Sequence, residues 1–484
     1  MKLNDEQLLK KQSFIENKWV DASDKKTFAV RNPANGEVVA EVADCGQKET
    51  EEAITCAYKA FGKWSKKTAK ERGTLMKRWF DLINQHADDL ALLMTTEQGK
   101  PLAEAKGEVL YGASFIEWFA EEAPRIYSEV IPSPSNDKRL FTIKQPIGVV
   151  AAITPWNFPM AMITRKISPA IAAGCTVVVK PAELTPLSAL ALAELAMQAG
   201  IPEGVINIIT TSNAPEVGKL LTGHRLISKL SFTGSTATGK LLMEQCASTV
   251  KKVSLELGGN APLIVFDDAD LSQAVKGALA SKYRNAGQTC VCANRILVQE
   301  NIYTAFMQEY TKAVKALKVG NGAEEGVQIG PLINEDAVNK VNRLLKDALS
   351  KGATISVGGE SNVGGKLFFS PTVITGCTTE MALSKEEIFG PVSAIYKFST
   401  EEEAIRIAND TEYGLAAYFF SQNINRAWRV AEQLEYGIVG INEGIVSHAE
   451  APFGGMKESG IGREGSKYGI EEYLEVKYIC LGGM

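Results

Sequence analysis

Histidine is scarce in this sequence, and long apolar runs are missing from it. The three histidines, His86, His224 and His448, are too few and too far apart for a histidine-based metal site. Nowhere do about 18 apolar residues run together, so we expect no membrane-spanning helix. The net charge is −5, and lysine and arginine are scattered rather than clustered, which gives no reason to expect nucleic-acid binding.

Cysteine is present but thinly spread. The chain begins with polar residues that lead into Lys10 and Lys11 without the apolar core of a secretory signal. We therefore expect reduced thiols in a cytoplasmic protein. Cys290 and Cys292 form the one close pair, and no second pair stands at zinc spacing, so we predict no metal site. The eight cysteines are Cys45, Cys56, Cys175, Cys246, Cys290, Cys292, Cys377 and Cys480.

Short apolar runs that alternate with helical segments are abundant. Residues 1–145 begin with short strands, continue as helices to about Glu122, and pass through a Pro-containing linker at 132–135. From Gly148 to Leu257 strands and helices alternate, which predicts a parallel, doubly wound sheet of the dinucleotide-binding type. Residues 259–455 repeat the alternation, so we expect a second α/β domain there.

Two segments carry specific structural predictions. Thr185 is expected to cap a helix over 185–199, with Pro186 at the first helical position. The tail, 472–480, alternates like an edge strand and has no neighbour in the sequence. We therefore expect it to pair with a sister subunit, alongside the exposed strand predicted at 139–144.

The residues before Cys290 are small and polar. Gly287, Gln288 and Thr289 allow the backbone to approach a ligand and leave a side chain open to solvent. A buried structural cysteine usually has large apolar neighbours, so this context favours a reactive thiol. Taken alone, the pattern leaves a structural role open as well.

Two predicted strand ends carry residues suited to a nucleotide. Gly234 and Gly239 flank a strand-to-helix turn, where free N–H groups favour a pyrophosphate, although such turns also occur without ligands. Lys180 ends a buried apolar strand, at the edge where α/β sheets bind ligands, and it either contacts a ligand or merely reaches solvent. Glu183, three residues on, is placed to accept hydrogen bonds from a ribose diol.

Glu256 and Asn157 are candidates for a general base and an oxyanion donor. Glu256 lies in a strand destined for burial, which raises the pKa of a carboxyl toward the range that a base needs. A structural ion pair is the alternative for this residue. Asn157 lies between Pro155 and Pro159, which either fix its amide as an oxyanion donor or make it an ordinary turn-former.

Seven motifs together resemble the aldehyde dehydrogenase superfamily, in order and spacing, over essentially the whole chain. The resemblance implies a Rossmann-type cofactor domain (1–126 and 147–257), an α/β catalytic domain (258–457) and a small β oligomerisation unit with the C-terminal tail (127–146 and 458–484). It also implies a dimer or tetramer. The motifs are Trp156-Asn157-Phe158-Pro159, Lys180-Pro181-Ala182-Glu183, Phe232-Thr233-Gly234-Ser235-Thr236, Leu255-Glu256-Leu257-Gly258-Gly259, Gly287-Gln288-Thr289-Cys290, Glu387-Ile388-Phe389-Gly390-Pro391 and Pro452-Phe453-Gly454-Gly455.

The resemblance implies a role for each matching residue. Cys290 attacks the aldehyde, the Asn157 side chain and the Cys290 N–H hold the oxyanion, and Glu256 activates the water that hydrolyses the thioester. The hydride passes to NAD, with NADP as the alternative. Glu183 favours NAD, because its carboxylate would repel a 2′-phosphate. The residues implied to bind the cofactor are Thr154, Pro155, Trp156, Lys180, Glu183, Gly234, Ser235, Leu257, Glu387 and Phe389.

The substrate is expected to carry a carboxylate. Arg165 and Arg284 lie near Asn157 and Cys290 in the sequence, and arginine binds carboxylates through two hydrogen bonds. An ion pair within the protein is the alternative for either arginine. Ser447 is implied to complete the carboxylate site, although His448 competes for the same aligned position. This pattern is similar to the succinate-semialdehyde dehydrogenase branch. Glutarate semialdehyde remains an alternative, since one methylene discriminates by only about 1–3 kcal/mol.

Two other functions are alternatives to aldehyde oxidation, and Cys292 has a possible regulatory role. A non-catalytic nucleotide-binding protein on the same fold is expected to lack Cys290 or Glu256, and both are present. A CoA-acylating enzyme generally lacks a base such as Glu256. Cys292 either forms a disulfide with Cys290 under oxidation, which would block the nucleophile, or is a small buried hydrophobe.

Overall fold

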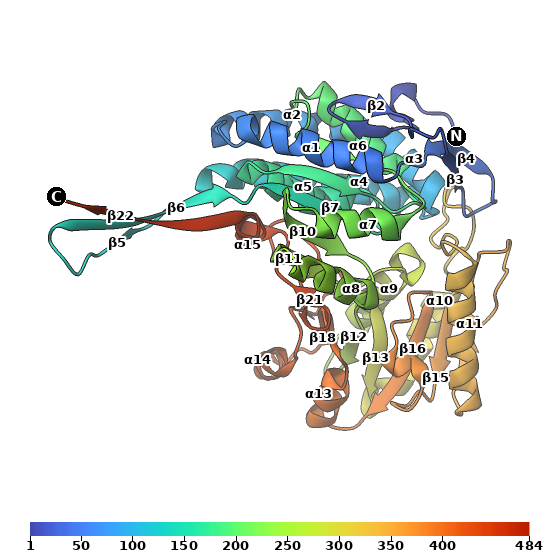
Figure 1. The fold of residues 1–484 in the computed structure, drawn as a ribbon. Coiled ribbons are helices and arrows are strands. Elements are labelled where there is room, and N and C mark those ends of the chain that lie inside the picture. The colour runs from blue at the N-terminus through green and yellow to red at the C-terminus, as the bar shows by residue number, and fades with distance from the viewer. Residues whose placement is uncertain (484) are drawn as a thin grey trace.

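The computed structural model describes residues 1–483. They form two large, separate sheets, and a long three-stranded arm extends at one side (Figure 1). The first sheet and its helices form the upper part of Figure 1, and the second sheet forms the lower part. Among the described residues, no helix combines the length and the apolar character needed to span a bilayer.

The first sheet has the order β2-β1-β9-β8-β7-β10-β11-β21, and β9, β8, β7, β10 and β11 run parallel. The chain passes outward from β7 through β8 to β9, and then returns to the other side of β7 for β10. Such a reversal opens a crevice at the carboxyl ends of the two central strands. Its strands are β1 (Ser13–Ile15), β2 (Lys18–Val20), β7 (Val149–Ile153), β8 (Thr176–Lys180), β9 (Ile206–Ile208), β10 (Ile227–Thr233), β11 (Lys252–Glu256) and β21 (Gly460–Ile461).

Helices cover both faces of this sheet, as the alternation predicted. The indole N–H of Trp64 donates to the carbonyl of Ile171 at 3.1 Å, and that of Trp79 donates to Leu192 at 3.1 Å, so these buried aromatics also satisfy their polar atoms. The helices are α1 (Gln47–Trp64), α2 (Ala69–Gln85), α3 (Ala87–Gln98), α4 (Leu102–Glu122), α5 (Ala161–Ala173), α6 (Leu187–Gln198), α7 (Ala214–Gly223) and α8 (Thr236–Ala247). A separate ribbon joins β3 (Thr27–Arg31) to β4 (Val38–Ala43).

The start of α6 differs from the prediction. Thr185 does not cap the helix, and Pro186 occupies the cap position without a side-chain hydrogen bond. The buried carboxylate of Glu97, on α3, instead accepts hydrogen bonds from the backbone N–H groups of Leu187 and Ser188, both at 2.8 Å. A residue about 90 positions away therefore supplies the cap, which no local pattern reveals.

The second sheet has the order β14-β15-β16-β13-β12-β18-β19, parallel except at β14. It begins directly after the first sheet, because only residues 257–260 separate β11 from β12. Its strands are β12 (Ala261–Val265), β13 (Ala293–Gln299), β14 (Thr354–Val357), β15 (Thr372–Thr375), β16 (Val392–Phe398), β18 (Ala416–Phe420) and β19 (Ile438–Ile441). Its helices are α9 (Leu271–Tyr283), α10 (Glu300–Lys315), α11 (Glu335–Ser350), α12 (Ala382–Lys385), α13 (Glu401–Asn409) and α14 (Ile424–Gln433). The short strands β17 (Tyr413–Gly414) and β20 (Met456–Lys457) pair beside it.

The arm consists of β5 (Val130–Ile131), β6 (Lys138–Pro146) and β22 (Leu474–Gly482), and helix α15 (Ser466–Glu471) leads into it. Strand β22 pairs antiparallel with β6 of the same chain, from Leu474 opposite Pro146 to Gly482 opposite Lys138. The predicted proximity of the tail to the strand at 139–144 is confirmed, and the two segments meet within one chain. Pairing of the tail with a sister subunit stays a prediction. The opposite edge of β22 remains unpaired in the sheet order β22-β6-β5.

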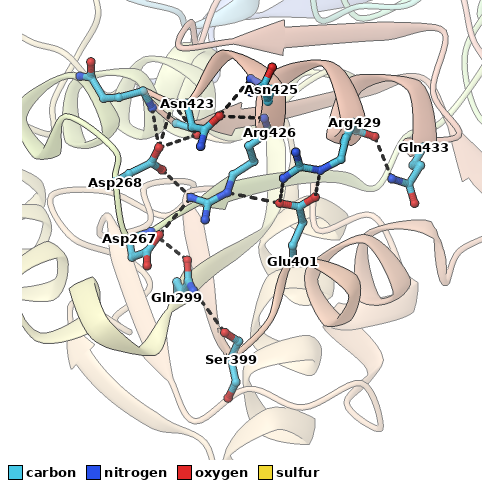
Figure 2. Close-up of polar contacts among 12 residues, drawn as sticks. Asp267, Asp268, Gln299, Ser399, Glu401, Asn423, Asn425, Arg426, Arg429 and Gln433 are labelled. Atoms are coloured by element: carbon cyan, nitrogen blue, oxygen red, sulfur yellow. Dashed lines mark hydrogen bonds and ion pairs between the residues drawn. The ribbon is translucent and has the colours of Figure 1, made fainter.

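Helix α14, which the sequence patterns did not predict, is fastened by Arg426 (Figure 2). The guanidinium lies 3.0 Å from Asp267 and 2.6 Å from Asp268, just after β12, and 3.3 Å from Glu401 at the start of α13. The Arg426 side chain is only 19% exposed and also lies 4.7 Å from the ring centre of Phe266. One cation thus joins three elements, in addition to the buried Ala427 and Val430 that pack α14 against the core.

We predict that Arg426→Ala loosens α14 locally. Without the shared cation, Asp267 loses its ion pair, while Glu401 keeps Arg429 and Asp268 keeps its hydrogen bonds to residues 421–423. We expect about 1.4 kcal/mol of local stability to be lost, or roughly tenfold faster amide exchange over 424–433. Hydrogen-exchange mass spectrometry measures this directly. Arg343→Ala is the control, because its pair with Glu386 is exposed on both sides and contributes little. Unchanged exchange in α14 would contradict the assignment.

Candidate functional site

Cys290 borders two cavities that meet between the sheets. The arginine-lined cavity has a volume of about 280 Å³ and contains Arg165 and Arg284 in its wall. The glycine-lined cavity has a volume of about 260 Å³ and contains Gly234 and Gly258. Cys290 lines both cavities. It therefore lies between the arginine-lined cavity and the cavity at the crevice of the first sheet.

The glycine-lined cavity brings together most residues that the sequence implied for the cofactor. Thr154, Lys180 and Glu183 do not line it. Ala337 and Lys340 of α11 do line it and were not predicted. The predicted residues in its wall are Pro155, Trp156, Asn157, Gly234, Ser235, Leu257, Glu387, Phe389 and Cys290.

The residues predicted to bind the cofactor form arrangements that are suited to a nucleotide. Ser235 caps α8, and its Oγ accepts from the N–H of Thr238 at 3.3 Å, so the positive end of the helix faces the crevice. Lys180 ends β8 almost fully buried, and its ammonium lies 3.0 Å from the Glu183 carboxylate. The rings of Trp156 and Phe389 meet edge to face, with centroids 5.7 Å apart.

Glu387 lies at the junction of the two sheets. Its Oε1 accepts a hydrogen bond from the backbone N–H of Gly259 at 3.1 Å. Burial raises the pKa of this carboxyl to about 7. Phe389, two residues after Glu387, has φ of 56°, in the left-handed region that residues other than glycine rarely adopt. The loop that carries both residues is therefore held in a strained shape beside Cys290.

The chain before Cys290 is also strained. Helix α9 ends at Tyr283, and the next turn contains Asn285 with φ of 52° and Ala286 with φ of 55°. Gly287 follows with φ of 75°, and a Cβ there would lie 2.2 Å from the carbonyl oxygen of Gly390. Only glycine fits this approach. Backbone strain of this kind is concentrated at functional sites, where it fixes a reactive residue.

The thiol of Cys290 is half-buried and protonated at neutral pH. Burial raises its pKa to about 12, and the nearby Glu387 carboxylate acts in the same direction. Arg165 opposes the shift but does not cancel it. The residue is therefore a neutral thiol in this state, and its proton must leave before the sulfur becomes a strong nucleophile.

Glu256 ends β11, buried as expected, and its Oε2 has no hydrogen-bond partner. Burial raises the pKa of this carboxyl well above its ordinary value, and the neighbouring carboxylate of Glu464 adds to the rise. Glu464 itself is buried, but Lys166 and Arg165 outweigh that burial and lower its pKa. The two acids thus differ: Glu464 carries the charge, and Glu256 is poised to bind or release a proton.

Asn157 is fixed through its side chain as well as its backbone. Its Nδ2 donates to the carbonyl of Gln288 at 3.0 Å, and its Oδ1 accepts from the N–H of Phe158 at 3.1 Å. Because an amide nitrogen has two hydrogens, one remains for another acceptor. The contact with Gln288 ties the loop after β7 to the loop that carries Cys290.

The two arginines have different surroundings. Arg165 is fully buried and bonded to Glu464, with Nε donating at 2.8 Å and a second nitrogen 2.6 Å away. Arg284 lies with its guanidinium 5.3 Å from the ring centre of Phe158, and within the described chain its side chain has no ion-pair or hydrogen-bond partner. Ser447 lines the same cavity, whereas His448 is exposed and does not.

Cys292 is buried beside a lysine rather than open to the cavity. The ammonium of Lys282, itself fully buried, donates to the Cys292 sulfur at 3.3 Å. Cys290 and Cys292 are both free thiols in this structure. Burial raises the pKa of the Cys292 thiol. Neither of the two predictions for this residue, regulatory disulfide or small buried group, is tested by this arrangement alone.

Sequence reasoning missed several charged residues of the site. Lys100, Glu104 and Glu108 line the arginine-lined cavity from the start of α4. Glu104 and Glu108 stand four residues apart on a helix that is otherwise largely apolar on that face, which is a signal that local patterns contain. Glu464 has no such signal, because its partner Arg165 lies 299 positions earlier.

Comparison with known proteins agrees with this geometry. Residues 19–479 match the aldehyde dehydrogenase family. The chain is 61% identical to the mitochondrial succinate-semialdehyde dehydrogenase of Oryza sativa subsp. japonica, covering 99% of this chain and 90% of the relative. It is 59% identical to the NADP(+) succinate-semialdehyde dehydrogenase GabD of Escherichia coli K12, covering 100% of both. It is also 59% identical to the glutarate-semialdehyde dehydrogenase of Pseudomonas putida, covering 99% of this chain and 100% of the relative.

A solved structure shows the same fold. The crystal structure of an aldehyde dehydrogenase from Brucella melitensis biovar abortus 2308 superposes with a TM-score of 0.99 at 59% identity, covering 100% of both chains. The predicted α/β fold of the aldehyde dehydrogenase type is thereby confirmed. With the family match over nearly the whole chain, the conclusion is direct: this protein belongs to the aldehyde dehydrogenase family.

Proposed function

We propose that this chain oxidises succinate semialdehyde to succinate with NAD or NADP. One observation carries the proposal: Cys290 forms the wall between a cavity with an unpaired arginine and a cavity at the nucleotide crevice of the first sheet. An aldehyde whose far end is a carboxylate suits the first cavity. The names of close relatives support succinate semialdehyde as that aldehyde.

The acylation step uses Cys290 and Asn157. The Cys290 thiol releases its proton to solvent, the sulfur bonds to the aldehyde carbon, and the C=O pair moves to oxygen. The free Asn157 amide hydrogen and the Cys290 backbone N–H are proposed to hold that oxyanion. Fixed donors of this kind stabilise developing charge without reorganising, which is the larger part of their effect.

The glycine-lined cavity fits the nicotinamide end of a dinucleotide. The capped N-terminus of α8 suits a pyrophosphate, and Glu387 suits a ribose hydroxyl. We propose that Lys180 and Glu183 hold the adenosine ribose beyond the cavity, and that Thr154, Pro155, Trp156, Gly234, Leu257 and Phe389 shape the site. When bound, the cofactor supplies the hydride acceptor that would oxidise the tetrahedral adduct on Cys290 to a thioester. Lys340 is a further candidate for a cofactor oxygen, because its side chain lines the cavity.

Deacylation is assigned to Glu256. Its unpartnered Oε2 and raised pKa are what a base needs to take a proton from water as that water attacks the thioester. The water hydroxyl then bonds to the acyl carbon, and the Cys290 sulfur leaves. The product is the carboxylic acid.

We propose NAD as the preferred cofactor. Glu183 places a carboxylate beside Lys180, where a 2′-phosphate would meet negative charge. A relative named for NADP(+) supports NADP as the alternative. Comparing kcat/KM for the two cofactors separates these possibilities.

The carboxylate of the substrate is assigned to Arg284, with Ser447 beside it. Arg165 lines the same cavity and is proposed to assist: its Nε is bonded to Glu464, whereas its Nη2 has no hydrogen-bond partner among the described residues. Glutarate semialdehyde is the second candidate, favoured by a relative of that name. A panel of both semialdehydes and an uncharged aldehyde of equal length tests the assignment.

We also propose that the protein is a cytoplasmic homo-oligomer, a dimer or tetramer. All eight cysteines are free, which supports a reducing compartment. The arm projects from the body with an unpaired β22 edge and exposed apolar side chains, which supports assembly (Figure 1). The exposed apolar residues of the arm include Val130, Val476, Tyr478 and Leu481. We assign cofactor binding to 1–126 with 147–257, catalysis to 258–457, and assembly to 127–146 with 458–484.

Glu256→Gln is expected to separate the two half-reactions. The variant should give one equivalent of reduced cofactor in a rapid burst, while steady turnover falls by roughly 100-fold or more, since only water activation is lost. Stopped-flow absorbance of the reduced cofactor measures both. Loss of the burst together with turnover would mean that Glu256 acts before the thioester forms.

The same residue sets a pH dependence. Because burial and Glu464 raise the pKa of Glu256, the base becomes protonated, and inactive, as the pH falls through that raised value. Steady-state kcat should therefore decrease on the acidic side and recover as the pH rises. The acidic limb should vanish from the residual activity of Glu256→Gln. A limb that persists unchanged in the variant belongs to another group.

Arg284→Met is expected to remove the preference for a charged substrate. The loss of a desolvated carboxylate partner costs about 2–5 kcal/mol, or roughly 30-fold or more in kcat/KM for succinate semialdehyde. The value for butanal should stay within about threefold. Arg343→Met, on the surface, serves as the control. Equal kcat/KM for the two aldehydes in the unsubstituted protein would reject the carboxylate site.

Cys292 provides a test of redox control. If Cys290 and Cys292 form a disulfide under oxidation, peroxide inactivation should be reversed by a thiol in the unsubstituted protein and become irreversible in Cys292→Ala. Recovery of cofactor-reducing activity is the measurement. Identical recovery by the two proteins would leave Cys292 as a buried packing residue beside Lys282.

A further inference from the structure

Lys100 is a buried cation that lies beneath the proposed oxyanion donor. It is 2% exposed, and its ammonium donates to the backbone carbonyl of Asn157 at 2.8 Å. The same nitrogen is bonded to the buried carboxylate of Glu108 and lies 4.0 Å from the ring centre of Phe158. Burying a lysine costs several kcal/mol unless the charge is paired and hydrogen-bonded. The Lys100 ammonium makes its contacts with the loop after β7 and with Glu108.

Glu108 holds the other end of that loop. Its Oε1 accepts hydrogen bonds from the N–H groups of Met160 at 3.0 Å and Ala161 at 3.2 Å. Helix α5 begins there and has no cap from its own side chains. The carboxylate therefore supplies the missing N-cap from α4. Together Lys100 and Glu108 grip the segment from Asn157 to Ala161 at both of its ends.

A second set of bonds links the same carbonyl to the cysteine loop. The Asn285 side chain donates to the Asn157 carbonyl at 2.9 Å, so that oxygen accepts from Asn285 and Lys100 together. Gln98 completes the circuit: its Nε2 donates to Asn285 at 3.0 Å, and its Oε1 accepts from the Lys100 N–H at 3.0 Å. Both acceptor directions of the carbonyl are filled, and the peptide plane at Asn157 is fixed.

We propose that Lys100, paired with Glu108, is a positioning residue for the oxyanion donor. It acts through Asn157, whose side-chain amide it aims by fixing the backbone, and it does not touch the reacting atoms. The proposal rests on the oxyanion role assigned to Asn157 above. A misplacement of about 1 Å in such a group can cost roughly 100-fold in rate. The pair should therefore influence acylation, and neither substrate binding nor deacylation.

The test compares burst rates in neutralised variants. Lys100→Met alone leaves a buried, unpaired Glu108, so the informative variant is Lys100→Met/Glu108→Gln, which removes both charges together. We expect its burst rate constant to fall about 10- to 100-fold, with KM for the aldehyde changed less than about threefold. Lys229→Met is the matched control. Lys229 is equally buried and paired with Glu472, but it lines neither cavity, and its burst should stay unchanged.

A cycle with Asn157→Ala distinguishes positioning from general loosening. If the pair acts through Asn157, the double substitution should have little further effect on the burst in the Asn157→Ala background. Additive losses, an unchanged burst in the double variant, or a fall matched by Lys229→Met would each overturn the proposal. Any aldehyde that the unsubstituted protein oxidises can be used. Failure of the unsubstituted protein to reduce the cofactor with any aldehyde would reject the proposed reaction itself, whereas normal reduction with an unaffected variant rejects only the role of Lys100.

Discussion

The short connection between β11 and β12 is the constraint on which the site depends. Residues 257–260 are all that separate the carboxyl edge of one sheet from the amino edge of the next. Asn260, within that connection, is buried and bonded to Ser384 at 2.8 Å and to Asn294 at 2.7 Å, so the junction has little freedom. Because the two edges face each other, Glu256 at the end of one sheet and Cys290 before β13 of the other belong to one site.

The charges around this junction are almost all compensated inside the protein. Glu464 is shared by Arg165 and Lys166, which leaves one positive charge in that group, and Glu108 neutralises Lys100, and all five side chains are shielded from water. In the wall of the arginine-lined cavity, among the described residues, Arg284 is a cation without an ion-pair partner. A buried pair contributes little attraction to a ligand, while an unpaired cation retains most of its field. The selectivity that we propose therefore comes from what is left unpaired more than from the number of charges present.

Sequence patterns predicted the parts of the site that lie close together in the chain. The turn at Gly234 and Ser235 and the buried strand ending in Glu256 could be recognised from periodicity and residue type. The cap of α6 could not, because Glu97 provides it from another helix. Nor could the partner of Arg165, or the role of Lys100, since these depend on side chains brought together only by the packing of α4 against α5 and of the C-terminal segment. The tail strand was matched to its correct partner, but strand pairing alone does not reveal whether the two strands share a chain.

The protonation of Cys290 has a further consequence. Because burial raises the pKa of this thiol, its neutral form is favoured over the thiolate at neutral pH. Alkylating agents and oxidants react with the thiolate, so the resting protein carries its nucleophile in an inert form. Anything that brings positive charge or a hydrogen-bond donor to the sulfur lowers that barrier. The nucleophilicity of Cys290 is therefore linked to the charges and hydrogen-bond donors that the two adjoining cavities bring to its sulfur.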